Sequence, residues 1–223
     1  MNIIIHRGTH QIGGSAIEIS TASTRIILDF GNELSLDEKY TPINLDIDGV
    51  TKGLPDCDGI VISHYHMDHL GQLTAALPEI PLYMGVLSKE VAMISAEYQD
   101  KNLYLRLLGA NTFRGGEAFT IGDIRIRPLV IDHSAADSYM FVIEAEGKHV
   151  LYTGEVDVLI TEGTSLSRDA DKYISEAAVL DDISSYIQDG KYVFIMCSST
   201  NIDRIMGIWQ NMPTDKVLIC DAY

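Results

Sequence analysis

The sequence is short of several kinds of residue, and each shortage excludes a class of protein. Only 16 of its 223 residues are Lys or Arg, against 32 Asp and Glu, which gives a formal net charge of −16. This surplus of acid opposes simple electrostatic capture of nucleic acid, which needs concentrated Lys and Arg. Only six prolines and 18 glycines accompany 46 % hydrophobic residues, so a collagen-like or low-complexity chain is excluded and a globular protein is indicated.

Long apolar runs and paired cysteines are lacking as well. The longest apolar stretches, such as 192–197, fall far short of the roughly 20 residues that a membrane span needs. Cys57, Cys197 and Cys220 are odd in number and widely spaced, which argues against a disulfide framework. We therefore expect a cytoplasmic protein that has no membrane partner. The sequence leaves open whether it forms a homo-oligomer.

Alternating hydrophobic patterns and turn residues predict two groups of strands, one before and one after a helical stretch. The run 59–63 is compact and apolar throughout, which is typical of a strand buried on both faces. Glu146-Gly147 indicates a hairpin turn. The expected strands cover residues 2–6, 15–20, 24–30, 59–63, 124–130, 139–145 and 149–152.

Helix signals lie between these groups and beyond them. A helix at 70–77 would end before Pro78, because the residue before a proline resists helical geometry. A second, at 86–98, places Leu87, Val91, Ile94 and Tyr98 on one face. Further on, the pattern predicts an amphipathic helix from about 173 to 187, a strand at 192–197, a helix at 201–210 and a strand at 216–220, which is a βαβ-like tail.

Three imidazoles and a carboxylate stand within six positions, directly after the apolar run 59–63. They are His64, His66, Asp68 and His69. Imidazole nitrogen and carboxylate oxygen suit zinc, manganese or iron, and a loop that leaves a strand can aim several side chains into one pocket. A surface loop that happens to be rich in histidine is the alternative, but four potential ligands this close together favour a metal site.

The spacing His-x-His-x-Asp-His resembles the signature of the metallo-β-lactamase fold superfamily. The resemblance implies a metal-dependent hydrolase and an α/β fold, the αββα four-layer sandwich in which helices lie outside two packed mixed sheets. Asp29, which ends an apolar strand, resembles the family's first acidic motif. In the family this residue is not a ligand but supports the loop that carries the metal ligands. His133 matches the next single-histidine ligand. Glu155 stands where the family has an Asp that bridges two metal ions.

Two features depart from the family's pattern. Glu155 is one methylene longer than the usual Asp, so it can bridge two ions, bind only one or stand back from both. No histidine follows His149, although the family places its last ligand near its C-terminal end. One of the two metal positions can therefore lack a protein ligand in this chain.

Segments after Glu155 resemble the β-CASP insertion of ribonuclease J and of cleavage and polyadenylation nucleases. The run 192–204 is similar to the strand that ends in a Ser-rich turn before a helix, and 157–164 to a strand that ends in Glu-Gly-Thr, with Glu162 as its acidic motif. The run 133–138 resembles that branch's His-Ser-x-x-Asp-Ser segment. Since those proteins place the insertion before the last histidine, the branch explains why none is present here.

This resemblance predicts the domain organisation. We expect a metallo-β-lactamase-like metal-binding domain at 1–165 that lacks its C-terminal part, followed at 166–223 by the start of an α/β β-CASP-like domain. The chain would then be a fragment of a longer protein, and it need not be active alone.

For the chemistry, the resemblance implies two divalent metal ions, with zinc the first choice and manganese or iron the alternatives. His64, His66 and His133 would hold one ion, and Asp68 and His69 the other, with Glu155 between them. A metal-bound hydroxide would attack a phosphodiester such as RNA, and Asp68 would orient or deprotonate the water.

Two other functions stay open at this point. A small-molecule hydrolase of the thioesterase, lactonase or β-lactamase type would share the fold and would suit the acidic charge better. A catalytically degenerate metal-binding scaffold would agree with Glu155 and the missing last histidine. Ser199, Asn201 and Arg204 form a candidate phosphate site at the start of the helix 201–210, for which ordinary helix capping is the alternative.

Overall fold

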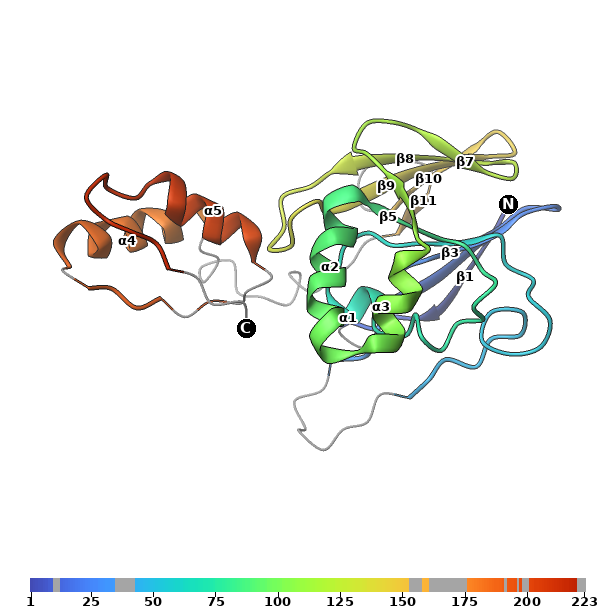
Figure 1. Cartoon of the computed structure of the whole chain (residues 1–223). Helices are drawn as coiled ribbons and strands as arrows, with labels where there is room; N and C mark the ends of the chain where they lie inside the picture. Colours follow the sequence, from blue (N-terminus) through green and yellow to red (C-terminus); the bar gives the residue numbers. More distant parts are fainter. Residues whose placement is uncertain are drawn as a thin grey trace. The chain divides into compact units, whose positions relative to one another are not determined.

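The structure is a computed structural model, and it describes residues 1–9, 13–34, 43–152, 158–160, 176–190, 192–195, 197 and 201–219. Its internal contacts divide the chain into two compact units. The first comprises Met1–Asp132 and Asp137–Thr164, and the second comprises His133–Ala136 and Ser165–Tyr223. Figure 1 labels most of the elements of both units.

The first unit contains a six-stranded mixed sheet in the order β1-β2-β3-β4-β5-β6. Pairing is antiparallel from β1 to β3 and parallel from β3 to β6. Of the parallel strands, β3, β4 and β5 are short and almost wholly buried, which agrees with the continuous apolar run predicted for the fourth strand, whereas β6 at the edge is mostly exposed. The strands are β1 (Asn2–Arg7), β2 (Ala16–Ser20), β3 (Arg25–Leu28), β4 (Gly59–Val61), β5 (Leu82–Gly85) and β6 (Asn111–Phe113).

A second sheet of five strands has the order β11-β10-β9-β8-β7. Its pairs are antiparallel except for β10 with β11, which is parallel. The predicted hairpin is confirmed, because Glu146 and Gly147 join β9 to β10 with φ values of 52° and 70°, the signs that a tight hairpin turn requires. The strands are β7 (Phe119–Ile121), β8 (Ile124–Val130), β9 (Tyr139–Ala145), β10 (Lys148–Tyr152) and β11 (Val158–Ile160).

The two sheets share one hydrophobic core (Figure 1). Every second residue of β9 is buried in this core, and so are Ile124 and Ile126 of β8, as the alternation in the sequence predicts. The prediction is wrong for Val130, which the same alternation places on this face but which is 67 % exposed. Together with the helices on the first sheet, this arrangement bears out the predicted metallo-β-lactamase-like sandwich. Core residues from both sheets include Ile17, Ile19, Ile26, Leu28, Val61, Ile124, Ile126, Phe141, Ile143, Val150 and Tyr152.

The described residues of the first unit include the helices α1 (Met67–Leu70), α2 (Val86–Gln99) and α3 (Lys101–Leu108), and α2 contacts β5 and β6. The predicted helix at 70–77 is wrong, because α1 ends at Leu70 and turns follow it. The N–H groups of Gln72 and Leu77 donate to the carbonyls of Phe30 and Val50, at 2.9 and 2.7 Å, and not to a preceding helical turn. Within the described residues, no helix is both long and apolar enough to span a bilayer.

The second unit contains α4 (Glu176–Asp189) and α5 (Ile202–Gln210), close to the two helices predicted there. The predicted βαβ-like tail is not formed, since neither 192–195 nor 216–219 is a strand. A strand exists only where a neighbouring strand accepts and donates its backbone hydrogen bonds. β-forming composition alone does not provide that neighbour.

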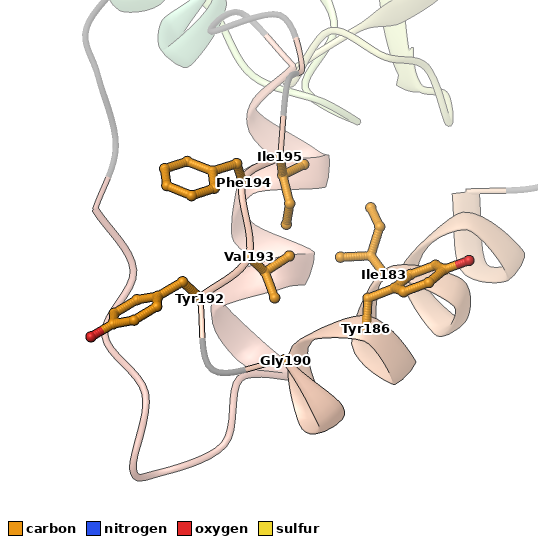
Figure 2. Close-up of a pocket in the computed structure, with 7 residues that line it drawn as sticks. All are labelled: Ile183, Tyr186, Gly190, Tyr192, Val193, Phe194 and Ile195. Carbon is orange, nitrogen blue, oxygen red and sulfur yellow. The ribbon is translucent and has the colours of Figure 1, made fainter.

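An open pocket of about 800 Å³ lies in the second unit, between the C-terminal half of α4 and the segment that follows it. Figure 2 shows Val193 and Ile195 directed toward Ile183 on α4, whereas Tyr192 and Phe194 point away. Phe194 is 95 % exposed. The described residues that line this pocket are mostly apolar or aromatic.

Candidate metal centre

The ends of parallel strands bring the candidate residues together. Asp29 follows β3, and Ser63 and His64 follow β4, which is parallel to β3 and hydrogen-bonded to it. Side chains that leave the carboxyl ends of adjacent parallel strands meet at one edge of a sheet, where ligands of open α/β sheets bind. Tyr152, at the end of β10, reaches the same place from the second sheet.

Asp29 is the centre of this arrangement. Its side chain is fully buried, and its φ of 55° lies in the left-handed region, which aspartate tolerates better than most residues. Ser63 donates its backbone N–H to Oδ1 at 2.7 Å and its hydroxyl to Oδ2 at 2.8 Å. The Tyr152 hydroxyl donates to Oδ2 at 2.9 Å, and His69 Nδ1 lies 2.8 Å from the same oxygen. These partners offset the cost of burying a carboxylate.

The hydrogen bonds around Asp29 assign the tautomers of two histidines. An ionised carboxylate only accepts, so His69 must carry its proton on Nδ1, which leaves the lone pair on Nε2. The Ser63 hydroxyl gives its one proton to Asp29, and it therefore accepts from Nδ1 of His64, 3.0 Å away. His64 also presents the lone pair of Nε2. A carboxylate behind an imidazole is the usual support of a metal-binding histidine.

One group of ligand atoms fits a single ion. One nitrogen from each of His64, His66 and His133 lies within 4.8 Å of the others. In a tetrahedral zinc site with bonds of about 2.1 Å, two nitrogens lie about 3.4 Å apart, so the three side chains would have to move closer together to bind one ion, and a fourth ligand would still be needed. His64 is buried, His66 half-buried and His133 exposed, which leaves the group open on one side.

Asp68 and His69 bring a second pair of ligand atoms together. Asp68 Oδ2 lies 3.5 Å from His69 Nε2, the nitrogen that carries the lone pair, and this is a suitable separation for two ligands of one ion. The rings of His64 and His69 are 4.0 Å apart, so the two sets of ligands are neighbours. Glu155, the residue expected between the ions, lies outside the described residues.

The backbone of residues 67–69 is held by the ends of the neighbouring strands. Asn32 and Phe30 donate their N–H groups to the carbonyls of Met67 and His69, at 2.9 and 2.7 Å. Gly14 donates to the carbonyl of Asp68 at 3.0 Å. A Cβ atom at Gly31 would overlap the same Asp68 carbonyl, so only glycine permits this close approach of the two backbones.

Most of the predicted site residues are thus found near one another, although their roles as ligands remain predictions. The candidate phosphate site belongs to the second unit. Asn201 is the N-cap of α5, and its side chain accepts from the N–H of Arg204 at 3.2 Å, which confirms the capping alternative. Ser199 lies outside the described residues, and phosphate binding there stays a prediction.

Sequence reasoning missed Ser63 and Tyr152. Both act on the site through Asp29, which is 34 residues from Ser63 and 123 residues from Tyr152. Ser63 could have been suspected from its place directly before the histidine cluster. Nothing in the sequence distinguishes Tyr152 from any other aromatic residue that ends a buried strand.

Comparison with known proteins gives this geometry a family. The model of the beta-lactamase superfamily domain matches residues 24–200, most of the chain. The chain belongs to the beta-lactamase superfamily. Its curated relatives support the metallo-β-lactamase/β-CASP ribonuclease branch of that superfamily, the branch that the motifs indicated. The fold binds divalent metal ions, usually zinc, and the histidine cluster has the donors to do so.

Members of this superfamily branch resemble the chain at low identity. An RNase J-like protein of Methanocaldococcus jannaschii is 24 % identical over 85 % of this chain and 49 % of its own length. Endoribonuclease YSH1 of Gibberella zeae is 26 % identical over 84 % of this chain and 27 % of its own. Ribonuclease J of Helicobacter pylori is 24 % identical over 73 % and 24 %. The chain spans about half, or less, of the length of these relatives.

A solved structure shares the fold. A protein of unknown function from Enterococcus faecalis aligns over 95 % of this chain and 63 % of its own, with a TM-score of 0.78. At 19 % identity this likeness concerns the fold alone.

Proposed function

We propose that the chain is the metal-binding part of a ribonuclease-type phosphodiesterase. The observation that carries the proposal is the hydrogen-bond chain from Asp29, which presents the Nε2 lone pairs of His64 and His69 to one place. The network holds both imidazoles with the proton on Nδ1, which leaves Nε2 available to bind an ion. This is the arrangement that metal-binding histidines usually have. The ribonuclease names of the curated relatives support RNA as the substrate class.

Each candidate ligand has a place in this proposal. His64, His66 and His133 would hold one divalent ion, and Asp68 and His69 would hold the other, with Glu155 between the two. Two divalent ions supply a water of lowered pKa and stabilise charge on the attacking and leaving oxygens of a phosphodiester. The protein's part is to fix the ligand positions beforehand, so that binding an ion requires little rearrangement.

Asp68 is the residue that we assign to proton transfer. Its side chain is 17 % exposed, whereas His69 is 6 % and Asp29 0 % exposed, so Asp68 is the acid of this cluster that solvent reaches. Oδ2 faces His69 Nε2, which leaves Oδ1 as the atom that accepts a proton. Asp29 lies at the back of the site, where its Oδ2 holds His69 through Nδ1.

Cleavage of RNA tests the proposal directly. A single-stranded RNA oligonucleotide with a fluorescent label is incubated with the chain and either Zn²⁺ or Mn²⁺. We expect cleavage that a chelator stops. His64→Ala should reduce both bound metal and rate by about 100-fold or more, because the buried imidazole Nε2 is lost. The control is His149→Ala, since His149 is an exposed histidine on β10 and should leave metal content and rate unchanged.

Three outcomes would contradict the proposal in different ways. A wild-type chain that binds no divalent metal at neutral pH rules out metal-dependent hydrolysis by these residues. A metal-loaded chain that hydrolyses thioesters or lactones and leaves RNA intact identifies the small-molecule hydrolase, which the net charge of −16 favours. A metal-loaded chain that cleaves neither class identifies a metal-binding scaffold.

A further inference from the structure

Arg7 is a buried arginine that neither a motif nor the family resemblance singles out. It ends β1, where the register with β2 shifts between Ile5 and Arg7, so that Ile5 faces Ile17 but Arg7 faces Ala16. The extra residue on β1 forms a bulge, and bulges turn a side chain away from the direction that regular pairing would give it. Arg7 is only 9 % exposed.

The guanidinium of Arg7 binds mainly backbone carbonyls. Nε donates to Gly14 O at 3.1 Å, Nη1 donates to Ile43 O at 2.7 Å, and Nη2 donates to Gly31 O. One carboxylate, that of Glu33, lies at 3.3 Å from Nη1 and is partly exposed. A guanidinium has donors in fixed directions, and here they join three separate segments of chain.

Two of those segments are the ones that hold the metal loop. Gly14, whose carbonyl binds Arg7, donates its own N–H to Asp68 O at 3.0 Å, and Ser15 donates to the same oxygen at 3.3 Å. Gly31, the second acceptor, is bonded to Ser15 through its N–H at 3.1 Å and lies against the Asp68 carbonyl. A single residue therefore separates the Arg7 guanidinium from the backbone of Asp68.

We propose that Arg7 is a positioning residue for the metal site, an inference that rests on the proposed function. By binding the carbonyls of Gly14 and Gly31 at once, Arg7 fixes the two backbone segments against which residues 67–69 lie. The positions of the Asp68 and His69 side chains follow from that backbone. Arg7 touches no ion and no substrate in this account; it acts through the main chain alone.

Arg7→Lys separates positioning from simple charge. Lysine keeps the positive charge beside Glu33, but one ammonium on a flexible stem cannot hold three carbonyls in fixed directions. The matched control is Arg106→Lys. Arg106 on α3 also donates to three carbonyls, those of Leu77, Pro78 and Ile80, and these lie outside the segments that hold residues 67–69.

The experiment measures Zn²⁺ affinity by competition with a chromophoric chelator, together with thermal melting of each metal-free protein. We expect both variants to melt at similarly lowered temperatures. Only Arg7→Lys should lose Zn²⁺ affinity, by about 10- to 100-fold, as is typical when a support of metal ligands is removed. Glu33→Gln should bind Zn²⁺ as the wild type does, because the three carbonyl bonds remain.

Each other outcome is decisive. If Arg7→Lys folds and binds Zn²⁺ as tightly as Arg106→Lys, the inference is overturned and the proposed function stands. If neither Arg7→Lys nor Arg7→Gln shows a cooperative melt while Arg106→Lys does, Arg7 is a determinant of the whole fold and not a positioning residue. A wild type that binds no Zn²⁺ overturns the proposed function and this inference together.

Discussion

Asp29 combines burial, charge and a left-handed backbone at a single residue. Its carboxylate accepts from Ser63, His69 and Tyr152, so one side chain joins both sheets to the histidine cluster. A strained backbone and a buried charge each lower the stability of a fold. Residues that combine the two are usually found at functional sites. We therefore regard Asp29 as the residue that determines how His69 faces an ion.

Asp29→Asn tests that role with little change in shape. Asparagine also tolerates a positive φ, but its amide nitrogen cannot accept hydrogen bonds from Ser63 and His69. Zn²⁺ affinity should fall about 10- to 100-fold in a chelator competition. Asp123→Asn is the control, because Asp123 is an exposed acceptor of the Thr21 hydroxyl in the β7–β8 turn. Equal affinities in the two variants would show that the Asp29 charge does not support the ligands.

Glu18 predicts a pH dependence of stability away from the metal centre. Burial by itself raises the pKa of Glu18, but hydrogen bonds from Arg25 and His6 outweigh it and hold the pKa below its usual value of 4.5. A carboxyl whose folded pKa is lowered stabilises the fold above its unfolded pKa. That contribution is lost as the pH falls through the folded value.

Glu18→Gln should therefore cost roughly 1–3 kcal/mol of unfolding free energy at pH 7, the usual loss for hydrogen bonds to a charged group. The difference from the wild type should shrink as the pH falls below about 4, because the wild-type carboxyl is then protonated too. Urea unfolding of both proteins, at pH 7 and at a pH below about 4, measures this difference in unfolding free energy. A difference that stays constant between them would mean that the Glu18 charge is not responsible.

At the scale of elements, α2 shows what sequence pattern can and cannot predict. Its bounds agree with the predicted helix to within one residue. Its buried residues are Ser88, Ala92 and Ala96, whereas Ile94 and Tyr98 on the apolar face are 60 % and 70 % exposed. These small side chains allow the helix to lie close to β5 and β6. Which face of the helix is buried therefore depends on the sheet that it packs against, and the helix sequence alone does not predict it.

The same distinction holds for the site. The closeness of His64, His66 and His69 could be predicted because they share one loop, and Asp29 and His133 could be proposed because the family motifs occur in order, whereas their roles as ligands stay predictions. Ser63, Tyr152 and Arg7 could not, since each acts through hydrogen bonds between segments that only the folded chain brings together. The strands predicted in the second unit, at 192–197 and 216–220, are absent from its described residues for a related reason. The sequence of a strand does not show which other strand will pair with it.

Gly31→Ala tests the close approach between the end of β3 and the metal loop. A Cβ atom there would overlap the Asp68 carbonyl, so the loop must move and Zn²⁺ affinity should fall by about 100-fold or more, with a lower melting temperature. Gly109→Ala is the control, because a Cβ at Gly109 meets no heavy atom closer than 4.0 Å. Wild-type affinity in Gly31→Ala would contradict the arrangement of these backbones.

At the scale of the whole molecule, metal binding should be visible in stability. A ligand that binds only the folded state at 100 times its Kd stabilises it by about 2.7 kcal/mol. Removal of Zn²⁺ with a chelator should therefore lower the melting temperature by several degrees. His64→Ala, melted with and without chelator, should show no such response. A wild-type melt that the chelator leaves unchanged would mean that no ion is held by the folded chain.

The central claim is that residues 64–69, together with His133, form a divalent metal centre. Anomalous X-ray scattering at the zinc edge, from crystals of the chain grown with Zn²⁺, tests it most directly. We expect one peak between His64, His66 and His133 and a second beside Asp68 and His69. Zinc peaks elsewhere, or none at these side chains, would contradict it.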